Sequence, residues 1–430
     1  MRPYAVIGAG PSGLAAVRRL SEKGIEVVGF EAHSSVGGLW DIESPTSTMY
    51  ETAHLISSKT TTQFDDFPMS DDVAVYPKHS ELKRYFEDYA AHFDVSSKFH
   101  FNSWVERVEP LEDHWRLTYR RENELHELDV EGVIIASGTL HHPKRLDLKG
   151  DFSGERLHSS DYRYPEQFDG KRVLIVGCGN SGCDIAVDAV HRARSVDMSV
   201  RRGYYFLPKF VMGKPTDTLG GLIKLPAKIK QWVDGMLVRL ISGKPSQFGL
   251  PDPDYKMYES HPVINSMFLH HIGHGDLTVR PSIDHASGNT VYFSDGTEAD
   301  YDLILEATGY VLDYPFIDKA YLNWSSMAPD LYLNMFTPNS DRLFVVGMVE
   351  AAGLGWQPRD QQARIIASFI AGRRAGDESA TDLWNEVKTG DYPSLNAGLN
   401  YLELERMSFY VNKQAYISAL NAAEKALGDC

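Results

Sequence analysis

Residues 4–13 read Tyr-Ala-Val-Ile-Gly-Ala-Gly-Pro-Ser-Gly, a short apolar run that ends in the pattern GxGxxG. The apolar run predicts a buried strand, helical spacing predicts a helix over 11–22, and Ile25 to Phe30 predicts a second strand after Gly24. In such a βαβ unit the glycines permit a tight turn and close approach of a pyrophosphate, and the helix N-terminus supplies free N–H groups. The unit therefore predicts a dinucleotide site, with expected contacts at Gly8, Gly10, Pro11, Ser12 and Gly13.

An acidic residue closes the second strand of this unit. Glu31 follows Gly8 by 23 residues, which is where a carboxylate binds ribose hydroxyls. Strand, helix and acid together favour a nucleotide site over a chance glycine turn. Shortly afterwards the chain reads Gly37-Gly-Leu-Trp40, which by itself indicates a second turn followed by an anchoring tryptophan.

A second unit of the same design begins at Arg172. Its apolar run Val173–Val176 leads into Gly177-Cys-Gly-Asn-Ser-Gly182, a helix is expected through about Arg192, and Val196 to Val200 predicts the next strand. This repetition predicts a second dinucleotide site in the same chain.

The second unit ends in cations where the first ends in a carboxylate. Arg201 stands 24 residues after Gly177 and is followed by Arg202. A guanidinium grips a 2′-phosphate with paired hydrogen bonds, whereas a carboxylate repels it. We therefore expect FAD in the first site and a preference for NADPH in the second. The alternative interpretation is that Arg201 and Arg202 are only solvent-exposed residues at the end of a strand. The expected contacts in the second unit are Gly177, Gly179, Asn180, Ser181, Gly182, Arg201 and Arg202.

These two units predict an α/β protein with two Rossmann-like dinucleotide-binding domains, the NADP domain being inserted in the FAD domain. The expected limits are 1–163 for the first segment of the FAD domain, 164–300 for the NADP domain, and 301–430 for the return segment with C-terminal helices. Further helices are expected over 79–92, 360–373 and 409–426.

The amino-acid composition limits the classes of partner and site that the chain can have. The 43 Lys and Arg residues against 59 Asp and Glu residues give a net charge of -16, which argues against nucleic acid as a partner. Three cysteines without a zinc-type spacing predict neither a disulfide scaffold nor a metal site. No signal peptide is evident, and no apolar stretch approaches the roughly 18–20 residues that span a bilayer. We expect a cytoplasmic protein with a small-molecule substrate, and a homodimer is left open.

Several motifs in one order resemble those of the flavin-containing monooxygenase family, the class B flavoprotein monooxygenases of soluble bacterial type. The segment from Phe152 to Tyr162 fits FxGxxxHxxxY, with Tyr162 where the related Baeyer–Villiger enzymes have Trp. The other matching segments are Glu31 followed by Gly37–Trp40, Phe64-Asp-Asp-Phe-Pro68, Glu306-Ala-Thr-Gly-Tyr310 and Gln362-Ala-Arg364. Within the fingerprint, His158 is expected to couple the domains structurally rather than to act as a base.

The resemblance implies a mechanism and further cofactor contacts. NADPH would reduce FAD, the reduced flavin would react with O₂ to a C4a-(hydro)peroxyflavin, and a sulfide or amine would take the distal oxygen. The residues implied beside the cofactors are Gly38, Leu39, Trp40, Thr308, Gly309 and Gln362. The family's active-site Asn falls on Ile56, which has no hydrogen-bonding group, so we expect Ile56 and its neighbour Ser57 at the catalytic position.

Three alternatives remain from the sequence, and a fourth is set aside. Ketone oxygenation of the Baeyer–Villiger type, an uncoupled NADPH oxidase and a flavin-binding redox sensor are all compatible with the two glycine motifs. A disulfide reductase would need a CxxC or CxxxxC pair beside the flavin, and we expect this chain to have neither.

Overall fold

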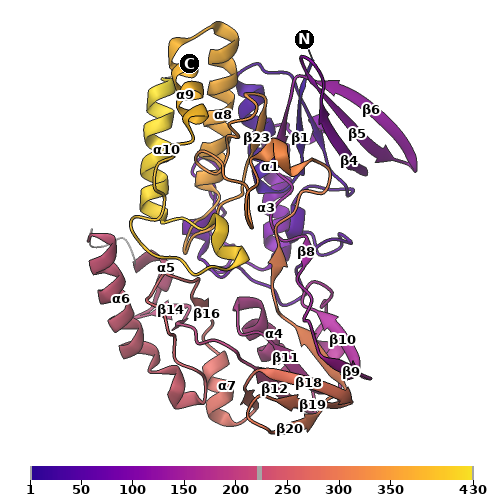
Figure 1. The fold of residues 1–430 in the computed structure, drawn as a ribbon, viewed down its shortest axis with the longest axis vertical. Helices are drawn as coiled ribbons and strands as arrows, with labels where there is room; N and C mark the ends of the chain where they lie inside the picture. The colour runs from indigo at the N-terminus through magenta and orange to yellow at the C-terminus, as the bar shows by residue number, and fades with distance from the viewer. Residues whose placement is uncertain (1, 220–224, 429–430) are drawn as a thin grey trace.

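The computed structural model describes residues 2–219 and 225–428 and shows two lobes, each built on a five-stranded parallel sheet (Figure 1). The first sheet has the order β23-β7-β1-β2-β3, and every neighbouring pair in it is parallel. Its strands are β1 (Tyr4–Ile7), β2 (Val27–Phe30), β3 (Phe99–His100), β7 (Gly132–Ile135) and β23 (Leu343–Val345). The carboxyl ends of these strands therefore meet at one edge, where the first glycine turn lies.

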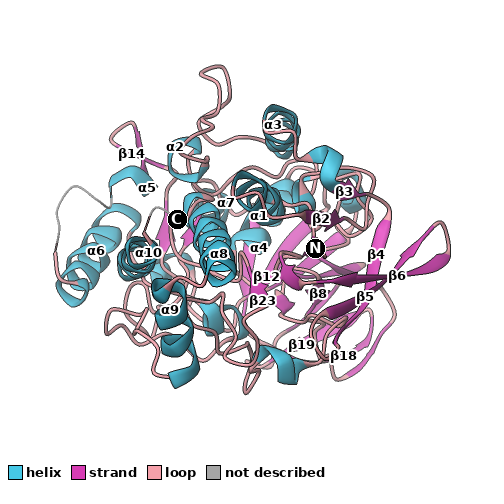
Figure 2. Ribbon diagram, turned by 90° about the horizontal axis from the view of Figure 1, so that it is seen from above, coloured by secondary structure: helices cyan, strands magenta, loops and turns pink. Residues whose placement is uncertain are grey.

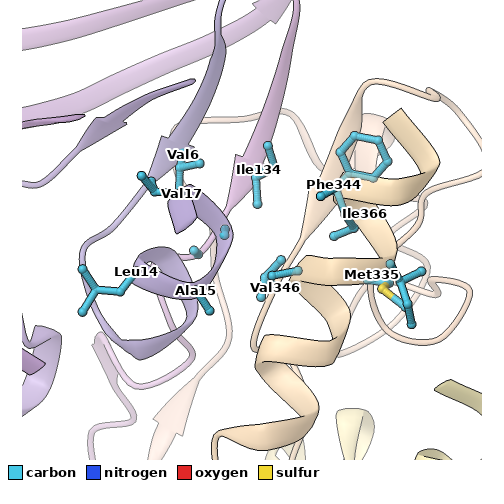
Figure 3. Packing of buried hydrophobic residues seen from close by; sticks show 14 of the residues in the cluster. Val6, Leu14, Ala15, Val17, Ile134, Met335, Phe344, Val346 and Ile366 are labelled. Atoms are coloured by element: carbon cyan, nitrogen blue, oxygen red, sulfur yellow. The ribbon is translucent and has the colours of Figure 1, made fainter. Parts of the chain in front are cut away.

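Helices cover the first sheet. The helix α1 (Pro11–Glu22) has the expected bounds and packs against α8 (Gln357–Ala375). The helix α8 also contacts α9 (Glu378–Thr389), which the sequence did not predict, and α10 (Lys413–Leu427). Figure 3 shows the apolar core that strands and helices share, with side chains from Val6, Leu14, Ala15, Val17, Ile134, Met335, Phe344, Val346 and Ile366.

Smaller elements complete this lobe. A three-stranded antiparallel sheet extends from it, formed by β4 (Ser103–Pro110), β5 (Trp115–Arg121) and β6 (Glu124–Val130). Two helices, α2 (Lys59–Thr62) and α3 (His79–His92), lie in the segment between β2 and β3, and α3 has the expected bounds.

The second sheet repeats the architecture of the first, with the order β10-β21-β11-β12-β17. Its strands are β10 (Glu155–His158), β11 (Arg172–Val176), β12 (Ser195–Ser199), β17 (Leu277–Arg280) and β21 (Leu303–Glu306). The helix α4 (Asn180–Val190) follows β11 directly and contacts α7 (Phe268–His274). A small sheet beside it contains β9 (Gly150–Phe152), β18 (Ile283–Gly288), β19 (Thr290–Phe293) and β20 (Glu298–Asp300).

Between β12 and α7 the chain forms the outer part of the second lobe. Its short strands are β13 (Phe206–Leu207), β14 (Phe210–Val211), β15 (Lys214–Pro215) and β16 (Val263–Ile264). Two helices, α5 (Thr216–Leu219) and α6 (Ala227–Ser242), belong to the same part, and α6 lies at the periphery in both views (Figures 1 and 2).

Strand pairing moves the limits between the domains away from the expected ones. The strands β10 and β21 pair with each other, and β21 pairs with β11, so all three belong to the second sheet. The expected limits at 163/164 and 300/301 therefore cut through one sheet. We propose that the chain crosses between the domains at 137–149 and 307–312, where β8 (His142–Pro143) pairs antiparallel with β22 (Tyr310–Val311).

A partly buried ion cluster joins α1 to α8 and to the Phe64–Pro68 segment. The guanidinium of Arg19 donates to both carboxylate oxygens of Asp360 at 2.8 Å and to Asp66 at 2.8 Å, and Arg18 donates to Asp66 at 2.7 Å. Burial alone would raise the pKa of Asp66, but the hydrogen bonds from Arg18 and Arg19 lower it to about 2. This carboxylate therefore stays charged at neutral pH and has a structural role.

Removing Asp360 tests the cluster. The side chains of Arg19 and Asp360 are only 10% and 7% exposed, and breaking such a pair leaves a buried charge at a cost of about 3–5 kcal/mol. Since Arg19 keeps Asp66, we expect Asp360→Ala to lower the free energy of unfolding in urea by about 3 kcal/mol. The control is Glu106→Ala, whose partner Arg120 is exposed and whose loss costs less than about 1 kcal/mol. Equal losses in the two variants would contradict this assignment.

Candidate functional site

The first glycine turn brings strand, turn and helix into backbone contact. Gly8 has a φ of +103°, and a Cβ at Gly13 would lie 1.8 Å from the Gly8 carbonyl oxygen. Gly10 is the N-cap of α1 and supplies no side-chain cap. The first N–H groups of α1 are therefore free to bind a phosphate.

A cradle lies over this turn. A Cβ at Gly38 would approach the Gly10 Cα to 3.0 Å, so the two backbones leave only a narrow space between them. Leu39 and Trp40 are half-buried beside it, and the Leu39 carbonyl accepts a hydrogen bond from the Ser47 hydroxyl at 2.6 Å. The arrangement fits the pyrophosphate and the adjoining part of FAD, because side chains are absent where the phosphates would pass.

Glu31 lies at this turn as the sequence predicts. Its carboxylate accepts hydrogen bonds from the backbone N–H of Ala9 at 2.7 Å and of His33 at 3.0 Å. Burial raises the pKa of Glu31 above its usual value. Each carboxylate oxygen retains a lone pair for a ribose hydroxyl.

Gln362 contacts the first glycine turn indirectly, through Gly347. Its amide oxygen accepts from the Gly347 N–H at 2.9 Å, and its amide nitrogen donates to the Tyr416 hydroxyl at 2.6 Å. A Cβ at Gly347 would lie 2.3 Å from the hydroxyl oxygen of Ser12. Gln362 is fully buried, so we propose that it positions the turn and does not itself contact the cofactor.

The second turn has nearly the same geometry. Gly177 has a φ of +107°, and a Cβ at Gly182 would lie 2.1 Å from the Gly177 carbonyl oxygen. A Cβ at Gly179 would meet no protein atom within 4 Å, and Ser181 is exposed at the start of α4. Gly179 and Ser181 therefore border open space where a second pyrophosphate fits.

Asn180 and the two arginines of this unit differ in their surroundings. The Asn180 side chain accepts from the Ile264 N–H at 2.7 Å and donates to the Pro262 carbonyl at 3.3 Å, so it holds a neighbouring strand. Arg201 is exposed and Arg202 is half-buried. Within residues 2–219 and 225–428, neither forms an ion pair with a carboxylate, which leaves both guanidinium groups available to an anion.

The connections between the domains contain the fingerprint residues. His158 is fully buried; its Nδ1 accepts from the Ser160 N–H at 3.0 Å, and its Nε2 lies 3.1 Å from the Gly309 carbonyl. Burial lowers the pKa of His158, which favours the neutral ring with the proton on Nε2. The Thr308 hydroxyl donates to the Lys144 carbonyl, so Thr308 and Gly309 both hold the crossing, in line with the structural role expected for His158.

Ile56 and Ser57 are half-buried in the segment that leads into α2. The hydroxyl oxygens of Ser57 and Thr62 are 2.7 Å apart. Two carboxylates of the second lobe contact this segment, namely Asp188 at Thr52 and Asp217 at Ser58. Sequence reasoning missed both, because each partner lies well over a hundred residues away and no local pattern marks it.

The expectation that the chain lacks a CxxxxC pair was wrong. Cys178 and Cys183 have this spacing, and their sulfur atoms are 3.6 Å apart and buried in the second turn. Burial raises the pKa of Cys183 well above its usual value, which holds it as an unreactive thiol. The pair belongs to the turn of the second domain, whereas a disulfide reductase needs it in the domain of Glu31.

In the part of the chain that the structure describes, no cluster of three or more His, Cys, Asp or Glu side chains is suited to a metal ion. No helix of the described ranges has the length and apolar character needed to cross a bilayer.

Comparison with known proteins identifies the family. The family described as Flavin-binding monooxygenase-like matches residues 2–393. Flavin-containing monooxygenase 3 of Homo sapiens is 32% identical over 414 residues, which cover 90% of this chain and 76% of the relative. The S-allyl-L-cysteine S-oxygenase of Allium sativum has a similar fold, with a TM-score of 0.67 and 20% identity over 99% of this chain and 88% of that one.

A second structural neighbour is the open crystal structure of cyclohexanone monooxygenase. It has a TM-score of 0.72 and 18% identity, and the match covers 99% of this chain and 98% of that chain. At such identities both neighbours show the two-domain fold alone. The family match and the two glycine turns together show that the chain belongs to the flavin-binding monooxygenase-like family, as an FAD- and NADPH-dependent oxidoreductase with two Rossmann-like domains.

Proposed function

We propose that this enzyme uses NADPH and O₂ to transfer one oxygen atom to soft nucleophiles such as sulfides and amines. The observation that carries the proposal is the position of Ile56 and Ser57 in a segment of the first domain whose Thr52 and Ser58 bond to Asp188 and Asp217 of the second domain. A sulfide or amine bound there would lie between the two cofactor sites. The 32% identity to a flavin-containing monooxygenase over nine-tenths of the chain supports the same reaction class.

The protein's own groups have defined tasks in this proposal. Bound FAD, once reduced by NADPH, supplies the oxygen chemistry. The Gly8–Gly13 turn and Glu31 hold FAD, and the Gly177–Gly182 turn with Arg201 and Arg202 holds NADPH. Ile56 contributes an apolar surface beside the reacting atoms and excludes water there.

Oxygenation of ketones is the second candidate. The cyclohexanone monooxygenase structure has the higher TM-score of the two neighbours, 0.72 against 0.67. Against this second candidate, Tyr162 stands where the Baeyer–Villiger fingerprint has Trp.

The absence of an amide at Ile56 supports a partly uncoupled reaction that releases hydrogen peroxide. The free thiols of Cys178 and Cys183 support a place in the reducing cytoplasm.

Substitutions in the two glycine turns test FAD binding and NADPH binding independently. Gly10 has an extended backbone, and a Cβ there would have 3.7 Å to the nearest protein atom, the Gly38 Cα. We expect Gly10→Val to fold normally and to lack flavin absorbance, because the side chain fills the pyrophosphate space. We expect Gly179→Val to keep its flavin and to raise the KM for NADPH at least tenfold. Each variant controls for the other, and loss of flavin in both would contradict the assignment.

Arg201 and Arg202 determine the preference for NADPH. A charge-assisted contact to the 2′-phosphate contributes about 1.5–3 kcal/mol, or roughly ten- to a hundred-fold in KM. We expect Arg201→Ala and Arg202→Ala to raise the KM for NADPH by such factors and to leave that for NADH nearly unchanged. Equal kinetics with NADH and NADPH in the wild type would show that neither arginine reaches the phosphate.

The fate of oxygen tests the reaction itself. With methyl phenyl sulfide we expect the sulfoxide as product, together with some hydrogen peroxide, and a cyclic ketone tests the second candidate. We expect Ile56→Asn to lower the peroxide formed per NADPH oxidised, because the amide supplies the missing hydrogen-bonding group, while Ile56→Val leaves it unchanged. If peroxide equals NADPH consumed with every substrate, the protein is an oxidase.

A further inference from the structure

The segment 52–62 is fastened to the second domain at its beginning. The carboxylate of Asp188 on α4 accepts a hydrogen bond from the Thr52 hydroxyl at 2.5 Å. The same oxygen accepts from the Tyr162 hydroxyl at 2.9 Å. Burial raises the pKa of Asp188 above its usual value, against hydrogen bonds from Thr52 and Tyr162 that lower it. One carboxylate therefore joins the first domain, the fingerprint and α4.

The end of the segment is fastened by a second carboxylate. One oxygen of Asp217 on α5 accepts from the backbone N–H of Ser58 at 2.8 Å, from the Ser58 hydroxyl at 2.9 Å, and from the Thr61 hydroxyl. The other oxygen of Asp217 is buried and has no hydrogen-bond partner among the described residues. Three donors on one charged oxygen form a strong contact, and all three come from the other domain.

An ammonium group of the first domain adds to this contact. Lys413 opens α10 and donates to the Gly353 carbonyl. Burial lowers the pKa of Lys413, and attraction to Asp217 opposes that effect. Asp217 is thus attracted to the first domain from two sides, although it belongs to the second.

We propose that Asp217, together with Asp188, positions the catalytic segment: the two carboxylates tie Ile56 and Ser57 to the domain that binds NADPH. Ile56 and Ser57 lie directly before Ser58, so the backbone at the catalytic position is held only as well as the start of α2 is held. The proposal rests on the proposed function. It names Asp217 as a positioning residue, because its contacts reach Ser58 and Thr61 rather than a substrate.

The matched control is another carboxylate with the same chemistry. Asp252 accepts from both the backbone N–H and the hydroxyl of Ser246 at 3.0 Å, but it stays within the second domain. We expect Asp217→Ala to retain FAD and to keep its KM for NADPH within twofold, while the peroxide formed per NADPH rises at least threefold. We expect Asp252→Ala to behave as the wild type. Equal peroxide yields in the two variants would overturn the proposal.

A measurement independent of turnover is amide hydrogen exchange in the FAD-loaded protein. Removing Asp217 should speed exchange in residues 53–62 about tenfold or more, with unchanged exchange in β1 and β11. Restoration of slow exchange by Asp217→Asn would support the role, since an amide oxygen still accepts hydrogen bonds. General acceleration over both sheets would instead indicate loss of stability and would overturn the positioning role.

A double-mutant cycle tests whether Asp217 acts directly through Ser58. Ser58→Ala removes the hydroxyl donor from the opposite side, and its effect on peroxide yield should be strongly non-additive with that of Asp217→Ala. Additive effects would contradict a direct link. If the wild type itself fails to oxidise NADPH, the proposed function fails, while the exchange experiment still decides whether Asp217 holds the segment.

Discussion

The close approach of a strand, a glycine turn and a helix determines the geometry of both domains. A Cβ at Gly13 would lie 1.8 Å from the Gly8 carbonyl oxygen, and a Cβ at Gly182 would lie 2.1 Å from that of Gly177. No side chain fits at either place, so the helix begins directly against the strand. This contact brings the free N–H groups of the helix to the edge where the carboxyl ends of the parallel strands meet. The cofactor sites follow from it.

Local patterns predicted this part of the structure well. The glycine turns, α1 and the acidic Glu31 were all expected, because apolar periodicity and glycine spacing depend on neighbours within a few residues. The family resemblance placed the fingerprint at the domain crossing, where His158 and Gly309 lie. The sign of the charge after each second strand also follows directly from the sequence. What each of these features contacts beyond its own unit did not follow.

The errors have a common physical cause, which is pairing between distant segments. The domain limits were misplaced because β10 and β21 lie almost 150 residues apart in the chain and pair only in the folded sheet. Gln362 beside the cofactor stays a prediction, and its bonds to Gly347 and Tyr416 from two other segments support the positioning role that we propose instead. Asp217 carried no signal at all, since its function depends on donors in a different domain. The CxxxxC pair, in contrast, was visible in the sequence and was overlooked.

The kind of contact between the domains bears on how the enzyme works. Within each lobe, elements are joined by apolar packing, whereas segment 52–62 is joined to the second lobe by hydrogen bonds from Thr52, Ser58 and Thr61 to carboxylates as well as by buried Ala53. When such hydrogen bonds break, each group bonds to water instead, whereas apolar surface that is exposed to water gains no such replacement. The crossing at β8 and β22 keeps the two lobes connected. With Asp217 in the positioning role that we propose, a shift of the second domain would therefore move Ser58 and, with it, the adjoining backbone of Ile56 and Ser57.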